Sequence, residues 1–120
     1  MVEWILVGAA ILPLVAAVSA KAGGSQFDNH EPRAWLAHQS GWRARAHAAQ
    51  KNTFEALPLF YAAVLFALYK GVDTDVIVQW GCIWLGLRLA YIWIYIKDWA
   101  LTRSIVWGLS FIVSIFILFL

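Results

Sequence analysis

The chain has 120 residues, of which 62% are hydrophobic and only 13% are charged. Soluble domains are nearer half apolar and a quarter charged, so this composition excludes an ordinary soluble domain and predicts one small membrane domain over residues 1–120. The net charge of +2 is too small, and the basic residues are too scattered, for a nucleic-acid-binding protein. The single cysteine excludes an intramolecular disulfide framework.

The first predicted transmembrane helix covers about residues 4–22. Residues 4–20 form an apolar run, close to the roughly 17–25 residues that cross a bilayer. Glu3 stands where a secretory signal peptide carries basic residues, so we interpret the run as a retained helix. Pro13 is expected to kink this helix, which neighbouring helices tolerate in a membrane.

Residues 21–42 form the longest polar segment of the chain, with the sequence KAGGSQFDNHEPRAWLAHQSGW. The Gly23-Gly24 pair is expected to end the first helix. The Asp28-Asn29 and Glu31-Pro32 pairs are typical of turns. We therefore predict an ordered connector at the membrane interface and no second domain.

Three further spans are predicted at about residues 46–69, 76–96 and 101–120. These runs are long, apolar and without strand-like alternation. The second helix begins near Gly41, outside the hydrocarbon, and contains Pro58. A short turn at residues 70–75 offers Asp73 or Thr74 as the N-cap of the third helix. The fold class expected is an all-α integral membrane protein, a four-helix transmembrane bundle.

Basic residues are concentrated on one side of the predicted bundle. Four spans put the connector and the turn at residues 97–103 on the same side, while the opposite turn carries only Lys70. The bases on the first side are Lys21, Arg33, Arg43, Arg45, Lys97 and Arg103. The positive-inside rule makes this side cytoplasmic and places both termini outside.

Four short helices enclose little interior, so polar groups on facing helices would be poorly covered in a monomer. We therefore expect a homo-oligomer with sites between subunits. The second span also carries many small residues, which suit close helix packing. These residues are Ala46, Ala48, Ala49, Ala56, Ala62, Ala63 and Ala67.

Polar side chains share one face of the second predicted helix. At about 100° per residue, Arg45, Ala48, Asn52 and Glu55 fall on one stripe of a helix that is otherwise apolar. A carboxylate in such a helix is costly and indicates a functional site by default.

The third helix carries a similar stripe formed by Arg88, Tyr91 and Tyr95. We expect Arg88 to neutralise Glu55, because charges within a membrane usually pair. For the two tyrosines, hydrogen-bond donation to a ligand and ordinary aromatic packing both remain open.

Arg103 and Ser104 open the fourth helix at the predicted cytoplasmic interface. The simplest interpretation is an anchor that snorkels to lipid headgroups. Alternatively, a guanidinium and a hydroxyl near a helix N-terminus bind a thiolate or another anion, and a nearby cation favours the thiolate by lowering a thiol pKa from about 8.5. His30, His38 and His47 lack metal-ligand spacing, so no metal site is expected.

The second-helix pattern RAxxAQxNxxExxPxF resembles the signature of the MAPEG family, the membrane-associated proteins in eicosanoid and glutathione metabolism. Its residues here are Arg45, Ala46, Ala49, Gln50, Asn52, Glu55, Pro58 and Phe60. The third-helix stripe and the Arg103-Ser104 pair also match the family in order and spacing. The resemblance covers essentially the whole chain, and the DNHEPR connector looks most like the bacterial branch.

The resemblance implies a homotrimer with glutathione bound as co-substrate between subunits, near the cytoplasmic face. Arg103 matches the residue proposed to stabilise the glutathione thiolate, and Ser104 matches its assisting neighbour. Bases would hold the two carboxylates of glutathione, and Glu55 its ammonium. The glutathione-binding residues expected are Lys21, Arg45, Lys51, Asn52, Glu55, Arg88, Tyr91 and Tyr95.

Two positions depart from the eicosanoid enzymes of the family. Ala48 replaces an arginine that lies one turn before the asparagine, and Trp107 stands where prostaglandin E synthase has a tyrosine. The leading hypothesis is a glutathione transferase or peroxidase of the bacterial inner membrane, whose small lipophilic substrate arrives from the bilayer along a groove between subunits. The alternative is a non-catalytic trimer whose polar residues serve helix packing or bind a lipid. A small proton-linked transporter has less support, because the chain has no inverted repeat.

Overall fold

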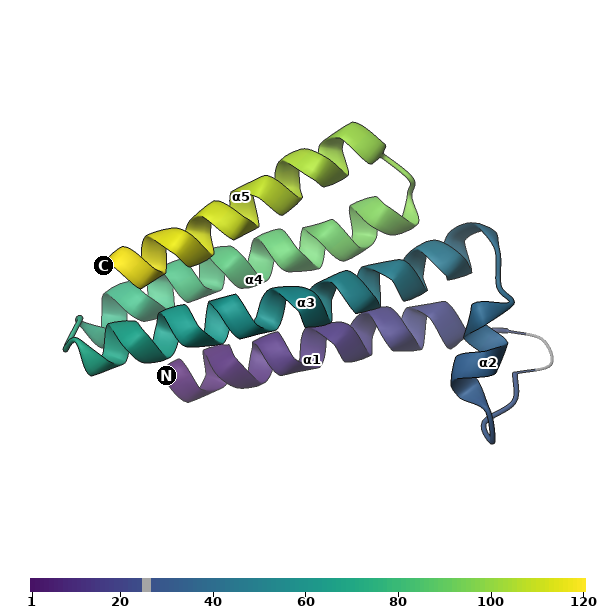
Figure 1. Ribbon diagram of the computed structural model, residues 1–120, viewed down its shortest axis with the longest axis horizontal. Helices are drawn as coiled ribbons and strands as arrows, with labels where there is room; N and C mark the ends of the chain where they lie inside the picture. Colours follow the sequence, from purple (N-terminus) through teal and green to yellow (C-terminus); the bar gives the residue numbers. More distant parts are fainter. Residues whose placement is uncertain (25–26) are drawn as a thin grey trace.

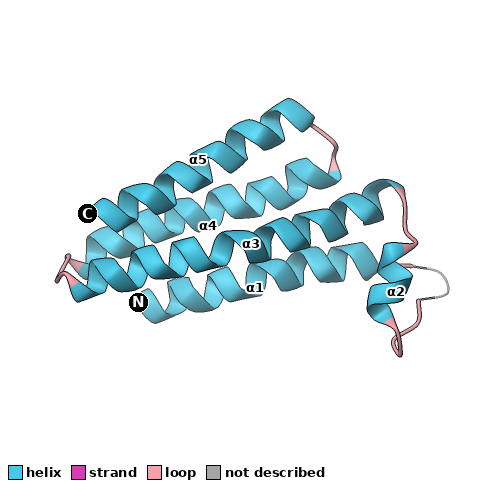
Figure 2. Ribbon diagram, viewed as in Figure 1, coloured by secondary structure: helices cyan, strands magenta, loops and turns pink. Residues whose placement is uncertain are grey.

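The computed structural model describes residues 1–24 and 27–120, and every regular element in these residues is a helix. The helices are α1 (Val2–Lys21), α2 (Pro32–Ala37), α3 (Gly41–Tyr69), α4 (Thr74–Ile96) and α5 (Ala100–Phe119). The four longer ones lie side by side, whereas α2 sits at one end of α1 and α3 (Figures 1 and 2). Each longer helix is long and apolar enough to cross a membrane. The predicted four-helix membrane fold is thereby confirmed.

α3 is the central helix and packs against α1, α4 and α5. Its small residues Ala46, Ala49, Ala63 and Ala67 are fully buried, which lets neighbouring backbones approach closely. Pro58 lies inside α3 without ending it, as Pro13 does in α1. The expected role of the alanines in packing therefore holds for these four.

Aromatic and small residues join the helices in the middle of the bundle. The Phe60 ring of α3 stacks on the Trp84 ring of α4 with 3.8 Å between centroids, and both side chains are almost completely buried. Gly81 of α4 lies so close to Ile5 of α1 that a Cβ there would be 2.7 Å from the isoleucine Cγ2. These two contacts set how α4 is turned about its axis.

The outward faces of the four long helices are apolar. Such faces suit lipid tails or other transmembrane helices and would be unusual on a soluble monomer. Exposed residues on α1 and α5 include Val7, Ile11, Leu14, Val18, Ile105, Leu109, Ile112 and Phe116.

Basic side chains near the ends of α3 bond to the carbonyls that other helices leave unpaired at their C-termini. Arg43 donates from Nη1 to the Ala20 carbonyl of α1 at 3.0 Å. Arg45 donates from Nε to the Ile96 carbonyl of α4, also at 3.0 Å. At the other end, Lys70 donates to a carbonyl in the last turn of α5. The bases thus hold helix ends together.

Two Schellman motifs close α3 and α4. After α4, Asp98 adopts a left-handed φ of 62°, and the Trp99 N–H donates to the Ile94 carbonyl at 3.3 Å. After α3, Gly71 takes the same role with a φ of 81°. The next helix then starts with the predicted cap, because the Asp73 side chain accepts a hydrogen bond from the Asp75 N–H. Both turns are therefore short and well defined.

The connector between α1 and α3 is more helical than its turn-forming residues suggested. Pro32, expected in a turn, occupies the first turn of α2, where its fixed φ suits a helix start. The Trp35 ring of α2 packs edge-on against Phe27 with 5.0 Å between centroids. The same ring lies 2.6 Å from where a Cβ on Gly24 would be, so a larger residue there would require the Trp35 side chain to move. Residues 25–26 of the expected connector lie outside the described residues.

Candidate functional site

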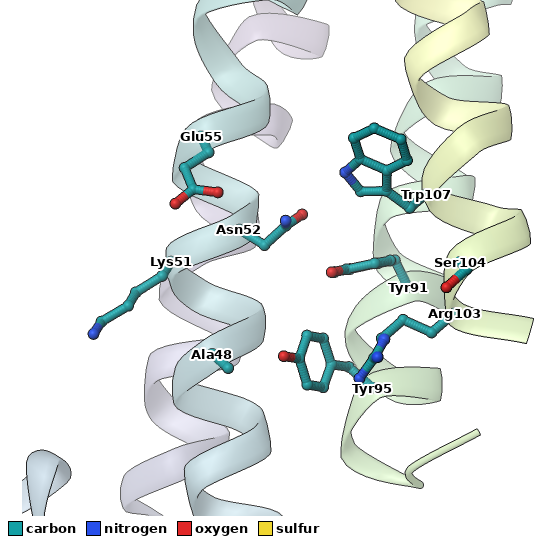
Figure 3. Close-up of a pocket in the computed structure, with 9 residues that line it drawn as sticks. All are labelled: Ala48, Lys51, Asn52, Glu55, Tyr91, Tyr95, Arg103, Ser104 and Trp107. Carbon is teal, nitrogen blue, oxygen red and sulfur yellow. The ribbon is translucent and has the colours of Figure 1, made fainter. Parts of the chain in front are cut away.

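A pocket of about 420 Å³ lies between α3, α4 and α5, near the end that carries the α4–α5 turn. We call it the Arg103 pocket. Its volume is within the range of about 300–1,000 Å³ that is usual for small-molecule sites. It is lined by Ala48, Lys51, Asn52, Glu55, Tyr91, Tyr95, Arg103, Ser104 and Trp107 (Figure 3).

Helical spacing brings these side chains to one place. The α3 residues at 48, 51, 52 and 55 follow steps of three or four, so they share one face of that helix. Tyr91 and Tyr95 are one turn apart on α4, and Arg103 and Trp107 are one turn apart on α5. Figure 1 shows α5 diverging from α3 toward this end, where the lining residues of the two helices face each other across the pocket (Figure 3).

The two tyrosine rings contact each other, and each ring also contacts one arginine. Their rings meet edge to face with 5.7 Å between centroids. The Arg103 guanidinium lies 4.5 Å from the centre of the Tyr95 ring, and the Arg88 guanidinium lies 4.2 Å from that of Tyr91. Both contacts are cation–π interactions, which hold a guanidinium over a ring face. Figure 3 shows the phenol hydroxyls directed toward α3.

The expected pairing of Arg88 with Glu55 is wrong. Arg88 is fully buried and donates from Nη2 to the Asn52 Oδ1 at 2.9 Å and to the Thr53 hydroxyl at 3.3 Å. Glu55 is exposed. The guanidinium therefore bonds to neutral oxygens one turn before the carboxylate, and it orients the Asn52 amide from behind the pocket.

The charged groups of the Arg103 pocket have no ionic partner within the described part of the chain, where the one ion pair joins the terminal amine to Glu3. Lys51 and Arg103 supply positive charge, and Glu55 supplies negative charge. The Ser104 hydroxyl donates to the Ala100 carbonyl at 3.2 Å, which leaves its oxygen able to accept. The arrangement suits a zwitterionic ligand that carries carboxylate, ammonium and a further anionic group.

Three predicted site residues lie elsewhere. Lys21 lines a groove of about 850 Å³ between α1, α2 and α3, which meets the Arg103 pocket at Ala48 and Lys51. Arg45 is bonded to the Ile96 carbonyl and does not line the pocket. Arg88 lines a second cavity deeper in the bundle.

Ala48 and Trp107 line the pocket but were not predicted as site residues. Both were noticed only because they depart from the eicosanoid enzymes. Helical spacing was the available signal, since Ala48 is four residues before Asn52 and Trp107 is four after Arg103.

Of the comparisons with known proteins, the one with family models found a match. The family model described as MAPEG family matches residues 1–120, the whole chain. No curated protein and no solved structure matches the chain.

Proposed function

Because its family match covers the whole chain, this integral membrane protein belongs to the MAPEG family, and we propose that it is a glutathione transferase or peroxidase. Members of the family are glutathione transferases, peroxidases or related proteins. The observation that carries the proposal is the Arg103 pocket, where α3 and α5 present charges opposite to those of one carboxylate, the ammonium and the thiolate of glutathione, and α4 adds two tyrosines.

Most polar groups of glutathione, all but one carboxylate, have a matching residue within one copy of the chain in the proposed complex. Lys51 would hold a carboxylate, Glu55 the ammonium, and Asn52 and the tyrosine hydroxyls the amide groups of the tripeptide. Arg103 would lie beside the sulfur, where a cation favours the thiolate. Ser104 would donate or accept a hydrogen bond next to it.

The second carboxylate of glutathione lacks a basic partner within one subunit, since Lys21 and Arg45 do not line the Arg103 pocket. This gap supports the proposed homotrimer, in which Lys21 of a neighbouring copy would complete the site. The apolar outer faces of the helices are suited to such contacts and to lipid. We further propose the bacterial inner membrane as the location, with the pocket toward the cytoplasm.

The thiolate would act on a lipophilic electrophile. In the transferase reaction a carbon–sulfur bond forms, and the leaving group departs with the electrons of the bond that breaks. In the peroxidase reaction the thiolate attacks a peroxide oxygen, the O–O bond breaks, and the alkoxide takes up a proton to form an alcohol. The glutathione sulfenic acid then condenses with a second glutathione to give the disulfide and water.

The test is the ultraviolet absorbance of the thiolate on titrating the detergent-purified protein with glutathione at neutral pH. An unperturbed thiol is only a few per cent ionised there, so Arg103→Ala should lower the thiolate fraction by about tenfold. Lys97→Ala removes an exposed basic residue that lines neither the pocket nor the groove of Lys21, and should leave the signal unchanged.

Turnover of chlorodinitrobenzene and cumene hydroperoxide then distinguishes transferase from peroxidase. A thiolate signal that Arg103→Ala does not alter would refute the role of this arginine. If glutathione does not bind at all, the non-catalytic trimer becomes the better description.

A further inference from the structure

A second cavity, which we call the Arg88 cavity, lies between α3, α4 and α5 and has a volume of about 210 Å³. It adjoins the Arg103 pocket, because Asn52, Glu55 and Trp107 line both. Any molecule held in the Arg88 cavity would therefore lie next to the proposed glutathione site.

Three aromatic residues contribute to the wall of the Arg88 cavity. Trp84 contributes a fully buried indole, while Trp107 and Phe111 stack on each other with 5.5 Å between centroids. An engineered apolar cavity of about 150 Å³ holds benzene. The Arg88 cavity is thus large enough for one aromatic ring with small substituents.

One side chain in this wall, a serine, is buried and has no hydrogen-bond partner in the described chain. The Arg88 Nε–H also lacks a hydrogen bond, but this nitrogen has no exposed surface, so a ligand in the cavity does not reach it; the Nη2 of the same side chain is bonded to Asn52 and Thr53. Ser114 is 2% exposed and makes no hydrogen bond among the described residues. By contrast, the Ser110 hydroxyl donates to the Trp107 carbonyl at 2.9 Å.

The unpaired Ser114 hydroxyl next to aromatic rings indicates which ligand fits. Burying a hydroxyl without a hydrogen bond is costly, so an oxygen acceptor beside it would be favoured. Glu55 also lines the cavity, and its carboxylate disfavours a ligand with a full negative charge. A neutral molecule whose oxygen carries partial negative charge satisfies both conditions.

We propose that the Arg88 cavity binds the second substrate, a compact aromatic lipophile with a neutral oxygen acceptor such as a nitro, carbonyl or hydroperoxide group. Ser114 donates a hydrogen bond to that oxygen, and the three aromatic residues lie around the ring. This inference rests on the proposed function for its meaning as a substrate site. It places that site within one subunit, whereas the sequence suggested a groove between subunits.

The test measures binding of dinitrotoluene without glutathione, through quenching of tryptophan fluorescence in protein reconstituted into lipid nanodiscs. Dinitrotoluene has nitro acceptors but no leaving group, so it binds without reacting. The wild-type protein should show saturable quenching above the linear background of lipid partition. Ser114→Leu fills the cavity and should weaken binding at least about tenfold. Ser19→Leu, on α1 and outside the cavity, should bind like the wild type.

Ser114→Ala removes the hydroxyl without filling the cavity, and it is the variant to use if Ser114→Leu fails to fold. It should weaken the binding of dinitrotoluene by about three- to tenfold, which corresponds to one hydrogen bond. The affinity of toluene, measured by competition, should change less than about twofold. Equal effects on both ligands would overturn the assigned recognition.

Failure of this inference can be told apart from failure of the proposed function. Quenching that never saturates, in protein that still gives the thiolate signal, overturns the cavity assignment alone and leaves water or lipid as its content. Saturable binding that Ser114→Leu abolishes supports the cavity assignment even if no thiolate forms, and only the role as a substrate site is then lost.

Discussion

The hydrogen bond between Arg88 and Asn52 should be measurable as a coupling energy. Asn52→Leu keeps the side-chain volume similar but removes the acceptor 2.9 Å from Nη2, which leaves Thr53 at 3.3 Å as the remaining side-chain partner. Hydrogen bonds to charged groups contribute about 1.5–3 kcal/mol. Coupling energies between helices in membranes average about 0.6 kcal/mol and reach about 1.7. Because Arg88 is fully buried and has no ionic partner among the described residues, we expect a coupling energy of about 1.5 kcal/mol.

The assay is a double-mutant cycle on the free energy of unfolding in mixed detergent micelles. Asn52→Leu should cost about 1.5–3 kcal/mol when Arg88 is present, and less than about 1 kcal/mol in an Arg88→Met background, where no cation is left unpaired. Asn29→Leu, in the connector, is the matched control and should be additive with Arg88→Met to within about 0.5 kcal/mol.

Additive effects of Asn52→Leu and Arg88→Met would refute the reasoning. They would mean that other groups stabilise the buried guanidinium. A coupling energy between Arg88→Met and Glu55→Gln as large as that expected for Asn52 would instead support the Arg88–Glu55 ion pair that the sequence suggested.

Three further predictions concern helix packing, ligand binding and membrane orientation. Gly81→Ala should lower the free energy of unfolding by about 1–3 kcal/mol, because the new Cβ would meet Ile5. Gly86→Ala has open space around it and should raise the free energy of unfolding by up to about 1 kcal/mol; thermal unfolding in detergent measures both. Glu55→Gln should weaken glutathione binding, measured by calorimetry, by about tenfold and leave the free energy of unfolding unchanged, since the exposed carboxylate makes no ion pair with any described residue. Loss of stability without loss of affinity would favour a structural role. Trp99→Cys, made in a variant that carries Cys82→Ser, tests the orientation. The new thiol should react with a membrane-impermeant maleimide only after the bacterial cells are opened, because the proposed orientation places it in the cytoplasm. Labelling of intact cells would show the opposite orientation.

The class of this protein was predictable because a bilayer permits few solutions. Backbone groups in hydrocarbon must be satisfied within the segment, so long apolar runs become helices, and their length follows from the rise per residue. The turns were predictable for a local reason, since the Asp73 cap depends on neighbours in the chain.

The residues of the Arg103 pocket were also predictable in large part. Asn52 with Glu55 and Tyr91 with Tyr95 share helix faces by spacing alone, and the family resemblance identified Arg103 and Ser104. Such spacing shows which side chains of one helix point the same way. It does not show what they point at.

Partners across helices were decided only by the tertiary structure. The rotation of α4 against α1 and α3 depends on Gly81 against Ile5 and on Phe60 against Trp84, contacts between residues far apart in the chain. That rotation gives Arg88 the Asn52 amide in place of the Glu55 carboxylate. The sequence by itself therefore determined a four-helix membrane protein with polar stripes, and packing determined which stripes meet, because a helical period specifies a face but not the neighbour that covers it.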